Sequence, residues 1–192
     1  MSFLKGNSEE RLARRLRSGD PDALREFYSA YGERLAAVCY RYIPNQDDAK
    51  DVLQDSLINI VSHIDSFHYR GAGSLQAWAV RITVNESLKY LRRTQRNLFV
   101  RLDKAEVGGE SVEVDESPDT EDIPADVLYG MVAGLPPGYR TVFNLYVIEG
   151  RSHKEIAESL GIRPDTSASQ LHKAKNMLAA KIREYRQEHN ED

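Results

Sequence analysis

The sequence predicts an all-α protein made of two small helical domains, the second of which contains a helix-turn-helix. Apolar residues recur at intervals of three and four through most of the chain, and no sustained alternation of period two lies between turn signals. Between the helical regions, residues 101–124 hold nine acidic and two basic side chains. We therefore predict domains at residues 1–97 and 124–192, joined by an acidic flexible linker at residues 98–123.

A Ser-Gly-Asp-Pro turn at residues 18–21 separates the first two predicted helices. They are expected at about residues 8–17 and from Pro21 to Tyr42, because glycine permits a left-handed helix end and proline suits a helix start. Cys39 is the single cysteine, which indicates a buried structural thiol in a reducing compartment. The inward face of the second helix is predicted to consist of Leu24, Phe27, Tyr28, Tyr31, Leu35, Val38 and Tyr42.

Two more helices are predicted in the first domain. Asn45 can cap a helix that continues to about residue 64, with carboxylates in its first two turns that complement the helix dipole. A loop with glycines at positions 71 and 73 interrupts the pattern, and Ser74 opens a helix that reaches about residue 96.

This last helix and the loop before it combine aromatic and basic side chains. Unpaired bases stack on aromatic rings while cations follow their backbone, so the combination is typical of a surface that binds single-stranded nucleic acid. The alternative is a core tryptophan beside a solvated basic stripe. The residues concerned are Phe67, His68, Tyr69 and Arg70 in the loop, and Trp78, Arg81, Lys89, Arg92, Arg93 and Arg96 in the helix.

In the second domain, helical periodicity resumes near residue 124, restarts at Pro136 and closes at Gly150. The most informative stretch follows at residues 152–162. It has a Ser-x-x-Glu capping-box spacing, a small alanine where a second helix must approach, and a glycine turn, and Pro164 suits the start of the next helix. Together these features predict a helix-turn-helix, although an ordinary helical hairpin with a solvated face is the alternative.

The second helix of this motif would present a polar face to phosphates and to base edges in the major groove of DNA. Its inward row is predicted to be Leu171, Ala174 and Leu178. The polar face is predicted to be Thr166, Ser169, Gln170, His172, Lys173 and Lys175.

The order of these motifs resembles that of the extracytoplasmic-function (ECF) sigma factors of bacterial RNA polymerase, in the sigma-70 superfamily. Residues 47–55, the stretch from Phe67 to Asn85 and the Tyr-Leu-Arg-Arg sequence at residues 90–93 resemble the first domain of that family. Residues 135–143 and the helix-turn-helix resemble the second domain. The resemblance implies a sigma factor that directs core polymerase to specific promoters and starts transcription there.

The resemblance also implies contact residues for each partner. The clamp helices of the largest polymerase subunit would be bound by Asp47, Asp48, Asp51, Gln54 and Asp55. Flipped bases of the −10 element would be held by Phe67, His68, Tyr69, Arg70, Ser74, Trp78, Arg81, Asn85, Lys89 and Arg92. The −35 duplex would be read by Arg163, Thr166, Ser169, Gln170, His172 and Lys173.

Further partners implied by the resemblance are the beta flap of the polymerase and an anti-sigma factor. The acidic linker would thread the RNA channel of the polymerase, with a plain tether as the alternative. The recognition helix departs from the family, because Ser167, Ala168 and Gln170 stand where the family commonly has valine and two basic residues. Fewer cations predict fewer phosphate contacts and a flatter salt dependence, so this domain is expected to bind DNA weakly unless polymerase holds it in place.

Two other function classes are weighed against this reading. One is a stand-alone helix-turn-helix regulator whose first domain senses a ligand or dimerises. The other is an enzyme, which is not expected, because the histidines and the carboxylates at residues 47–55 form no metal-ligand spacing. No catalytic residue, metal or cofactor is therefore predicted. The chain shows no signal-like start and no apolar run of about 18 residues, so we expect a cytoplasmic protein without membrane insertion.

Overall fold

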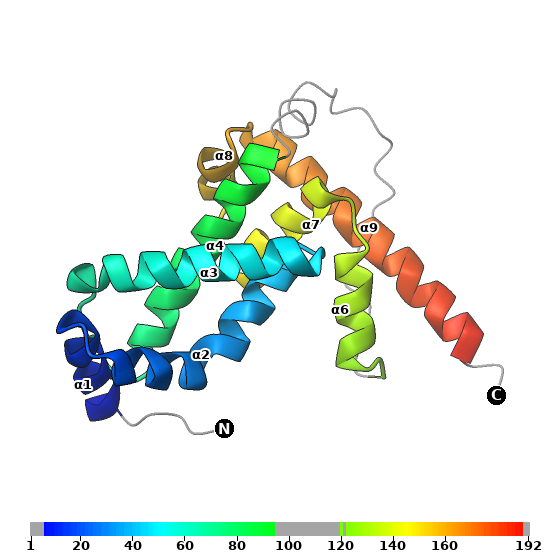
Figure 1. The fold of residues 1–192 in the computed structure, drawn as a ribbon. Helices are drawn as coiled ribbons and strands as arrows, with labels where there is room; N and C mark the ends of the chain where they lie inside the picture. Colours follow the sequence, from blue (N-terminus) through cyan, green and yellow to red (C-terminus); the bar gives the residue numbers. More distant parts are fainter. Residues whose placement is uncertain (1–5, 95–119, 121, 190–192) are drawn as a thin grey trace. The chain divides into compact units, whose positions relative to one another are not determined.

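The computed structural model describes residues 6–94, 120 and 122–189, and the chain divides into two compact units, Met1–Leu91 and Arg92–Asp192 (Figure 1). All regular structure in the described residues is helical, which confirms the predicted fold class. The first unit holds α1 (Gly6–Arg17), α2 (Pro21–Tyr42), α3 (Gln46–Ser62), the 3-10 turn η1 (Ile64–Ser66) and most of α4 (Ser74–Thr94). The second holds α6 (Ala125–Ala133), α7 (Pro137–Phe143), the π-helical turn η2 (Asn144–Ile148), α8 (His153–Leu160) and α9 (Pro164–His189).

Most of the predicted linker, including residues 98–119, lies outside the described residues, so its flexibility and the domain boundaries remain predictions. Arg96 of the predicted basic helix also lies outside them. No helix in the described part of the chain is long and apolar enough to cross a bilayer.

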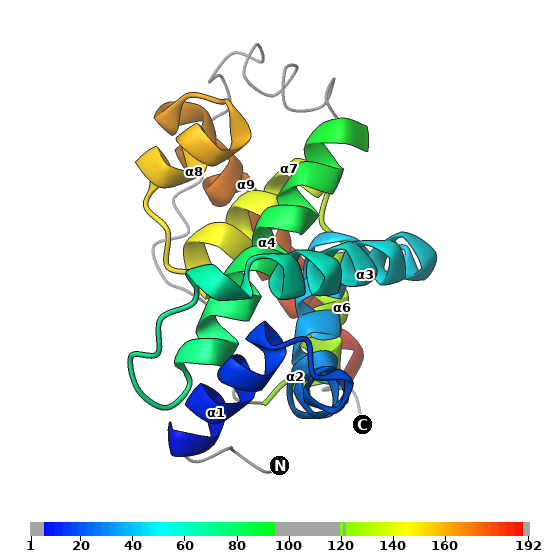
Figure 2. The same ribbon diagram turned by 60° about the vertical axis from the view of Figure 1, so that its left-hand side comes forward.

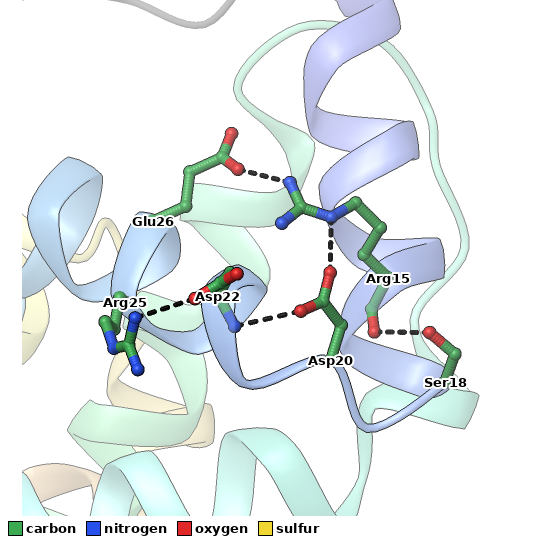
Figure 3. Close-up of polar contacts among 6 residues, drawn as sticks. All are labelled: Arg15, Ser18, Asp20, Asp22, Arg25 and Glu26. Carbon is green, nitrogen blue, oxygen red and sulfur yellow. Dashed lines mark hydrogen bonds and ion pairs between the residues drawn. The ribbon is translucent and has the colours of Figure 1, made fainter.

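The turn between α1 and α2 is fixed by the predicted proline start and by an aspartate that serves two partners (Figure 3). Oδ1 of Asp20 accepts a hydrogen bond from the backbone N–H of Asp22 at 2.9 Å and so caps α2. Oδ2 of Asp20 accepts from Nε of Arg15 at 2.7 Å, and Arg15 also pairs with Glu26. The hydrogen bond from Arg15 holds the pKa of Asp20 below its usual range.

We expect Asp20→Asn to separate the cap from the ion pair, because an amide oxygen can still cap α2 while the charge that attracts Arg15 is lost. The lowered pKa means that the wild-type pair stabilises the fold at neutral pH and loses this effect as the pH falls through the pKa of folded Asp20. Urea unfolding should therefore show a small loss of stability in the variant at neutral pH that disappears in acid. An equal loss at both pH values would contradict this assignment.

The core of the first unit lies between α2, α3 and α4. Its largest fully buried side chains are Phe27, Leu35, Tyr42, Ile60, Leu75, Val84 and Leu91, with Leu12 from α1. Asn45 caps α3 as predicted, and its Oδ1 accepts hydrogen bonds from the backbone N–H groups of Asp47 at 3.0 Å and Asp48 at 3.1 Å.

The prediction that Leu24 and Tyr28 face the core is wrong, because their side chains are 42% and 52% exposed. Helical periodicity identifies the face of a helix but not how far its neighbours extend along it. The Tyr28 ring instead lies over its own helix, where a Cβ at Gly32 would come within 3.1 Å of the ring carbons.

Cys39 is fully buried, as predicted, and burial raises the pKa of its thiol to about 12. Because the thiolate is the reactive species, we expect no reaction with an aromatic disulfide reagent in the native protein and one reacting thiol per chain after unfolding. Rapid labelling under native conditions would contradict the buried position.

In the second unit, α7 and α8 both pack against α9. The buried apolar residues include Leu135, Val142, Leu145, Ile156, Leu160, Leu171, Ala174 and Ile182. A charged residue accompanies them: Arg140 is buried on α7, and its Nη1 donates at 2.8 Å to each of the carbonyl oxygens of Ala133 and Leu135. Burial lowers the pKa of this guanidinium. Arg140 therefore ties the C-terminal end of α6 to α7.

Candidate nucleic-acid interface

The helix-turn-helix begins at a complete capping box. The backbone N–H of Ser152 donates to Oε2 of Glu155 at 2.8 Å, and the backbone N–H of Glu155 donates to Oγ of Ser152 at 3.3 Å. These hydrogen bonds hold the pKa of Glu155 below its usual range, with the side chain of Ser152 as the main cause. Gly161 ends α8 in the left-handed conformation, at φ 69°, where its N–H donates to the carbonyl of Ala157. The predicted capping box and the predicted glycine turn are therefore confirmed.

A second set of contacts joins α8 to the first turn of α9. Nδ1 of His153 lies 3.0 Å from Oγ of Ser167, and the His153 ring stacks on Tyr146 of η2 with the centroids 4.6 Å apart. Ser167 is fully buried. Ser167, where the family commonly has valine, therefore takes part in the packing of α8 against α9, and its side chain is not accessible to a ligand.

The polar face of α9 is narrower than predicted. Arg163, just before the helix, is exposed, and Ser169, His172 and Lys173 are partly exposed. Thr166 and Gln170, however, are only 3% and 4% exposed, so they do not belong to the exposed polar face of α9, and their contact with DNA stays a prediction. Gln170 stands one turn and Thr166 two turns before the fully buried Ala174, so all three side chains lie on the side of α9 that faces the core.

In the first unit, α4 carries an exposed polar stripe. At 100° per residue, Trp78, Arg81, Asn85 and Lys89 fall within an arc of about 80° on the helix surface. Arg81, Asn85 and Lys89 are exposed and Trp78 is partly exposed, while Lys89 pairs with Glu86 at 3.2 Å. Arg92 continues the polar surface in the last turn of the same helix and is also exposed. These residues form the α4 stripe.

The loop at residues 68–74, which ends at the first residue of α4, is shaped by its glycines and by a hydrogen bond within it. Gly71 and Gly73 have φ values of 120° and 85°, which side chains with a Cβ rarely adopt. The backbone N–H of Arg70 donates to Oγ of Ser74 at 3.2 Å. His68 and Arg70 are exposed and Tyr69 is partly exposed. Ser74 therefore orders the loop from within, and the three neighbouring side chains remain accessible.

The side chain of Phe67 is buried in this structure and does not lie on the exposed surface of the loop, so its contact with bases stays a prediction. Its ring lies 5.5 Å from that of Trp78, measured between centroids, at an angle of 54°. Phe67 therefore packs beneath the loop and against the Trp78 ring, and this contact helps to position both.

The acidic residues of α3 lie on the side of the helix opposite its buried residues. Asp47, Asp51, Gln54 and Asp55 are exposed, and Asp48 is partly exposed. Two apolar side chains are exposed further along the same side: Ile58, which sequence reasoning missed, and Val61, which the apolar pattern of the helix had included. The position of Ile58 at i+3 from Asp55 was the signal that could have found it. We call this surface, which combines carboxylates with two aliphatic side chains, the α3 face.

The described residues contain no group of three or more His, Cys, Asp or Glu side chains that could hold a metal ion. The histidines considered above as candidate catalytic residues make local contacts instead. Nδ1 of His68 lies 2.9 Å from the carbonyl oxygen of Ser66, and Nε2 of His172 lies 3.1 Å from the Asn176 side chain.

A helix-turn-helix in one helical unit, and an aromatic and basic surface in the other, define a transcription protein that binds DNA. Two family models match the chain, the Sigma-70 region 2 model at residues 27–97 and the Sigma-70 region 4 model at residues 125–178. The chain belongs to the ECF sigma factors of the sigma-70 family and directs RNA polymerase to promoters, which confirms the resemblance found in the sequence.

Curated relatives align over nearly the whole chain. The ECF RNA polymerase sigma-E factor of Haemophilus influenzae is 29% identical over 184 residues, which cover 91% of this chain and 95% of the relative. SigW of Bacillus subtilis is 27% identical over 182 residues, which cover 89% of this chain and 95% of the relative. Among solved structures, RpoE of Bartonella quintana in complex with the anti-sigma factor NepR matches 83% of this chain and 96% of that one, with 21% identity and a TM-score of 0.48.

Proposed function

We propose that this sigma factor divides promoter recognition between its two units. The first unit docks on core polymerase through the α3 face and holds melted −10 bases with the loop at residues 68–74 and the α4 stripe. The second contacts the −35 duplex with the exposed part of α9. The observation that carries this proposal is the α4 stripe, in which a tryptophan and three cations lie on one exposed helix face beside a glycine loop.

Base capture by the first unit is supported by chemistry that suits unpaired DNA. Stacking of a base on an aromatic side chain is worth about 1–3 kcal/mol, which is comparable to the cost of unstacking one base from a duplex. Tyr69 and Trp78 offer partly exposed rings, and Arg70 and Arg81 lie exposed near them in the chain to follow the phosphates. His68 and Asn85 add exposed hydrogen-bonding groups for base edges.

Duplex contact by the second unit depends on fewer residues than the sequence indicated. With Thr166 and Gln170 buried, we assign the −35 contacts to Arg163, Ser169, His172 and Lys173. Two of these four carry a fixed positive charge, so the salt dependence of binding should be shallow, at about one unit of slope per phosphate contact. The isolated second unit should bind DNA weakly and gain affinity only when polymerase holds it near the promoter.

Docking on polymerase is assigned to the α3 face. Its exposed carboxylates suit a basic partner surface such as the clamp helices of the largest subunit, and Ile58 supplies an exposed apolar side chain for the centre of the contact. We also infer an additional contact of the second unit with the beta flap. An anti-sigma factor is a further proposed partner.

We further infer that the chain catalyses no reaction of its own, because members of its family act by binding polymerase and DNA. Its proposed location is the cytoplasm, where the polymerase and the promoter DNA are found. A stand-alone regulator with a sensing or dimerising first unit is the competing function.

Run-off transcription with core polymerase and a library of random promoters tests the proposal. We expect transcripts that depend on this chain and start downstream of two conserved elements, one near −35 and one near −10. Core polymerase alone is the reference. If the purified chain protects a palindromic site without polymerase, and adding polymerase gives no gain and no new start site, the competing function is correct.

A further inference from the structure

α1 lies outside the part of the chain matched by the family model, which begins at residue 27 within α2. Its inward face nevertheless carries an ionisable residue, because Glu9 is 2% exposed. Oε1 of Glu9 accepts a hydrogen bond from the Tyr31 hydroxyl at 3.0 Å, and Oε2 accepts from the backbone N–H of Leu75 at 3.3 Å. Leu75 is the second residue of α4, so Glu9 holds the point where the loop at residues 68–74 ends.

The other end of α1 holds the point where that loop begins. Nη2 of Arg17 donates to the carbonyl oxygen of Phe67, and Nε donates to the carbonyl oxygen of Ile64 at 3.3 Å. The same guanidinium lies 3.9 Å from the Asp65 carboxylate. Figure 1 and Figure 2 both show α1 beside the segment that leads into α4.

The two contacts make α1 a spacer between the ends of the loop. Arg17 stands eight positions after Glu9, which corresponds to about 12 Å of helix rise. A helix changes its length little, so fixing both ends of the loop to one helix fixes the distance between them. The loop itself has two glycines with positive φ and would otherwise sample many conformations.

Simple packing does not account for these residues. A buried carboxylate costs free energy unless its oxygens are hydrogen-bonded, and an apolar residue on the inward face of α1 could hold that helix in place without this cost. Glu9 uses its oxygens on the α4 N-terminus and on Tyr31, whose own pKa is raised by burial and by Glu9. The arrangement therefore favours a defined geometry at the start of α4.

From these contacts we infer that Glu9 and Arg17 are positioning residues for the capture of −10 bases. They touch no DNA themselves but set the separation and orientation of the loop that carries His68, Tyr69 and Arg70. This inference rests on the proposed role of the loop and the α4 stripe. It extends the functional part of the first unit to a helix that the family model does not include.

The test uses the full chain assembled with core polymerase and a fork-junction promoter that carries 2-aminopurine at the −10 position whose base is extruded. Extrusion raises the fluorescence of 2-aminopurine. Arg17→Ala and Glu9→Gln should each weaken the fluorescent complex by roughly tenfold, because each loses a charge-assisted hydrogen bond to the loop or its end. Arg17→Lys keeps the charge without the fork geometry and should fall between wild type and Arg17→Ala.

Matched controls lie on the same helix. Glu10 and Arg14 form an exposed ion pair at 3.7 Å, and Glu10→Gln and Arg14→Ala should leave the fluorescent complex unchanged. Affinity for core polymerase and the thermal unfolding midpoint are measured for every variant. Arg17 is an exposed residue, so Arg17→Ala decides the question even if Glu9→Gln unfolds the first unit.

The outcomes separate this inference from the function on which it rests. If the wild-type complex gives no fluorescence change at any −10 position, base capture by the first unit is wrong. If the wild type captures the base and Arg17→Ala captures it equally well at unchanged affinity for polymerase, the positioning role is wrong. If the variants lose stability and capture in parallel, and the control variants do so as well, α1 acts only as a structural support.

Discussion

Replacing Asp51 and Asp55 together by arginine should reduce the affinity of the chain for core polymerase by about a hundredfold or more, since opposing like charges across an interface costs several kcal/mol. Both carboxylates are exposed, so the fold should tolerate the change. A competition assay against a labelled wild-type chain measures the affinity, and urea unfolding measures the stability.

The control for this charge reversal is Glu33→Arg, an exposed position on α2 away from the α3 face. It should bind polymerase with nearly wild-type affinity. Unchanged binding by the double variant would show that the chain docks through another surface. Ile58→Ala should give a smaller loss that depends little on salt, whereas the effect of the carboxylates should shrink as the salt concentration rises.

Arg140→Ala is expected to give the largest loss of stability, about 3 kcal/mol or more, because it removes a buried side chain and leaves one buried and one part-buried carbonyl oxygen without this donor. Those oxygens belong to Ala133 and Leu135. Arg140→Lys should be less damaging, since one ammonium group can still reach a carbonyl.

The loss should be confined to the second unit, and the single tryptophan of the chain allows this to be measured. Trp78 lies on α4 in the first unit, so its fluorescence reports the unfolding of that unit alone. In Arg140→Ala, the far-UV circular dichroism should show an early transition while the midpoint of the Trp78 transition stays in place. A shift of both by the same amount would mean that the two units unfold together.

Features determined by adjacent residues could be predicted from the sequence. The start of α2 at Pro21, the Asn45 cap and the capping box of Ser152 and Glu155 were all predicted, and each depends on hydrogen bonds within a few residues. The single buried thiol was predicted as well, because Cys39 lies in an apolar run.

Features determined by tertiary packing could not be predicted in the same way. The pattern did not show that Thr166, Gln170 and Phe67 are covered by neighbouring structure, or that Leu24 and Tyr28 lack such cover. Sequence periodicity assigns a polar residue to the exposed side of a helix, and only the position of the neighbouring helix shows whether the residue is covered.

One of the charged residues that the sequence analysis overlooked, Glu9, did leave a signal. Glu9 stands three, four and seven positions before Leu12, Ala13 and Leu16, which are all buried, so it occupies the apolar side of its helix. Arg140 left no such signal, because the residues four positions before and after it are Pro136 and Asn144, which do not mark an apolar helix face. A charged residue on an apolar helix face is the pattern that would have identified Glu9.

The most direct test of the division of promoter recognition between the two units is cleavage of promoter DNA by a tethered iron chelate. Ala77 on α4 and Ala168 on α9 are exposed, and each can be replaced by cysteine to carry the chelate, because the native thiol of Cys39 is buried. In complex with core polymerase, Ala77→Cys should direct cleavage to the −10 element and Ala168→Cys to the −35 element. Cleavage of one common site by both variants, or the same pattern without polymerase, would contradict it.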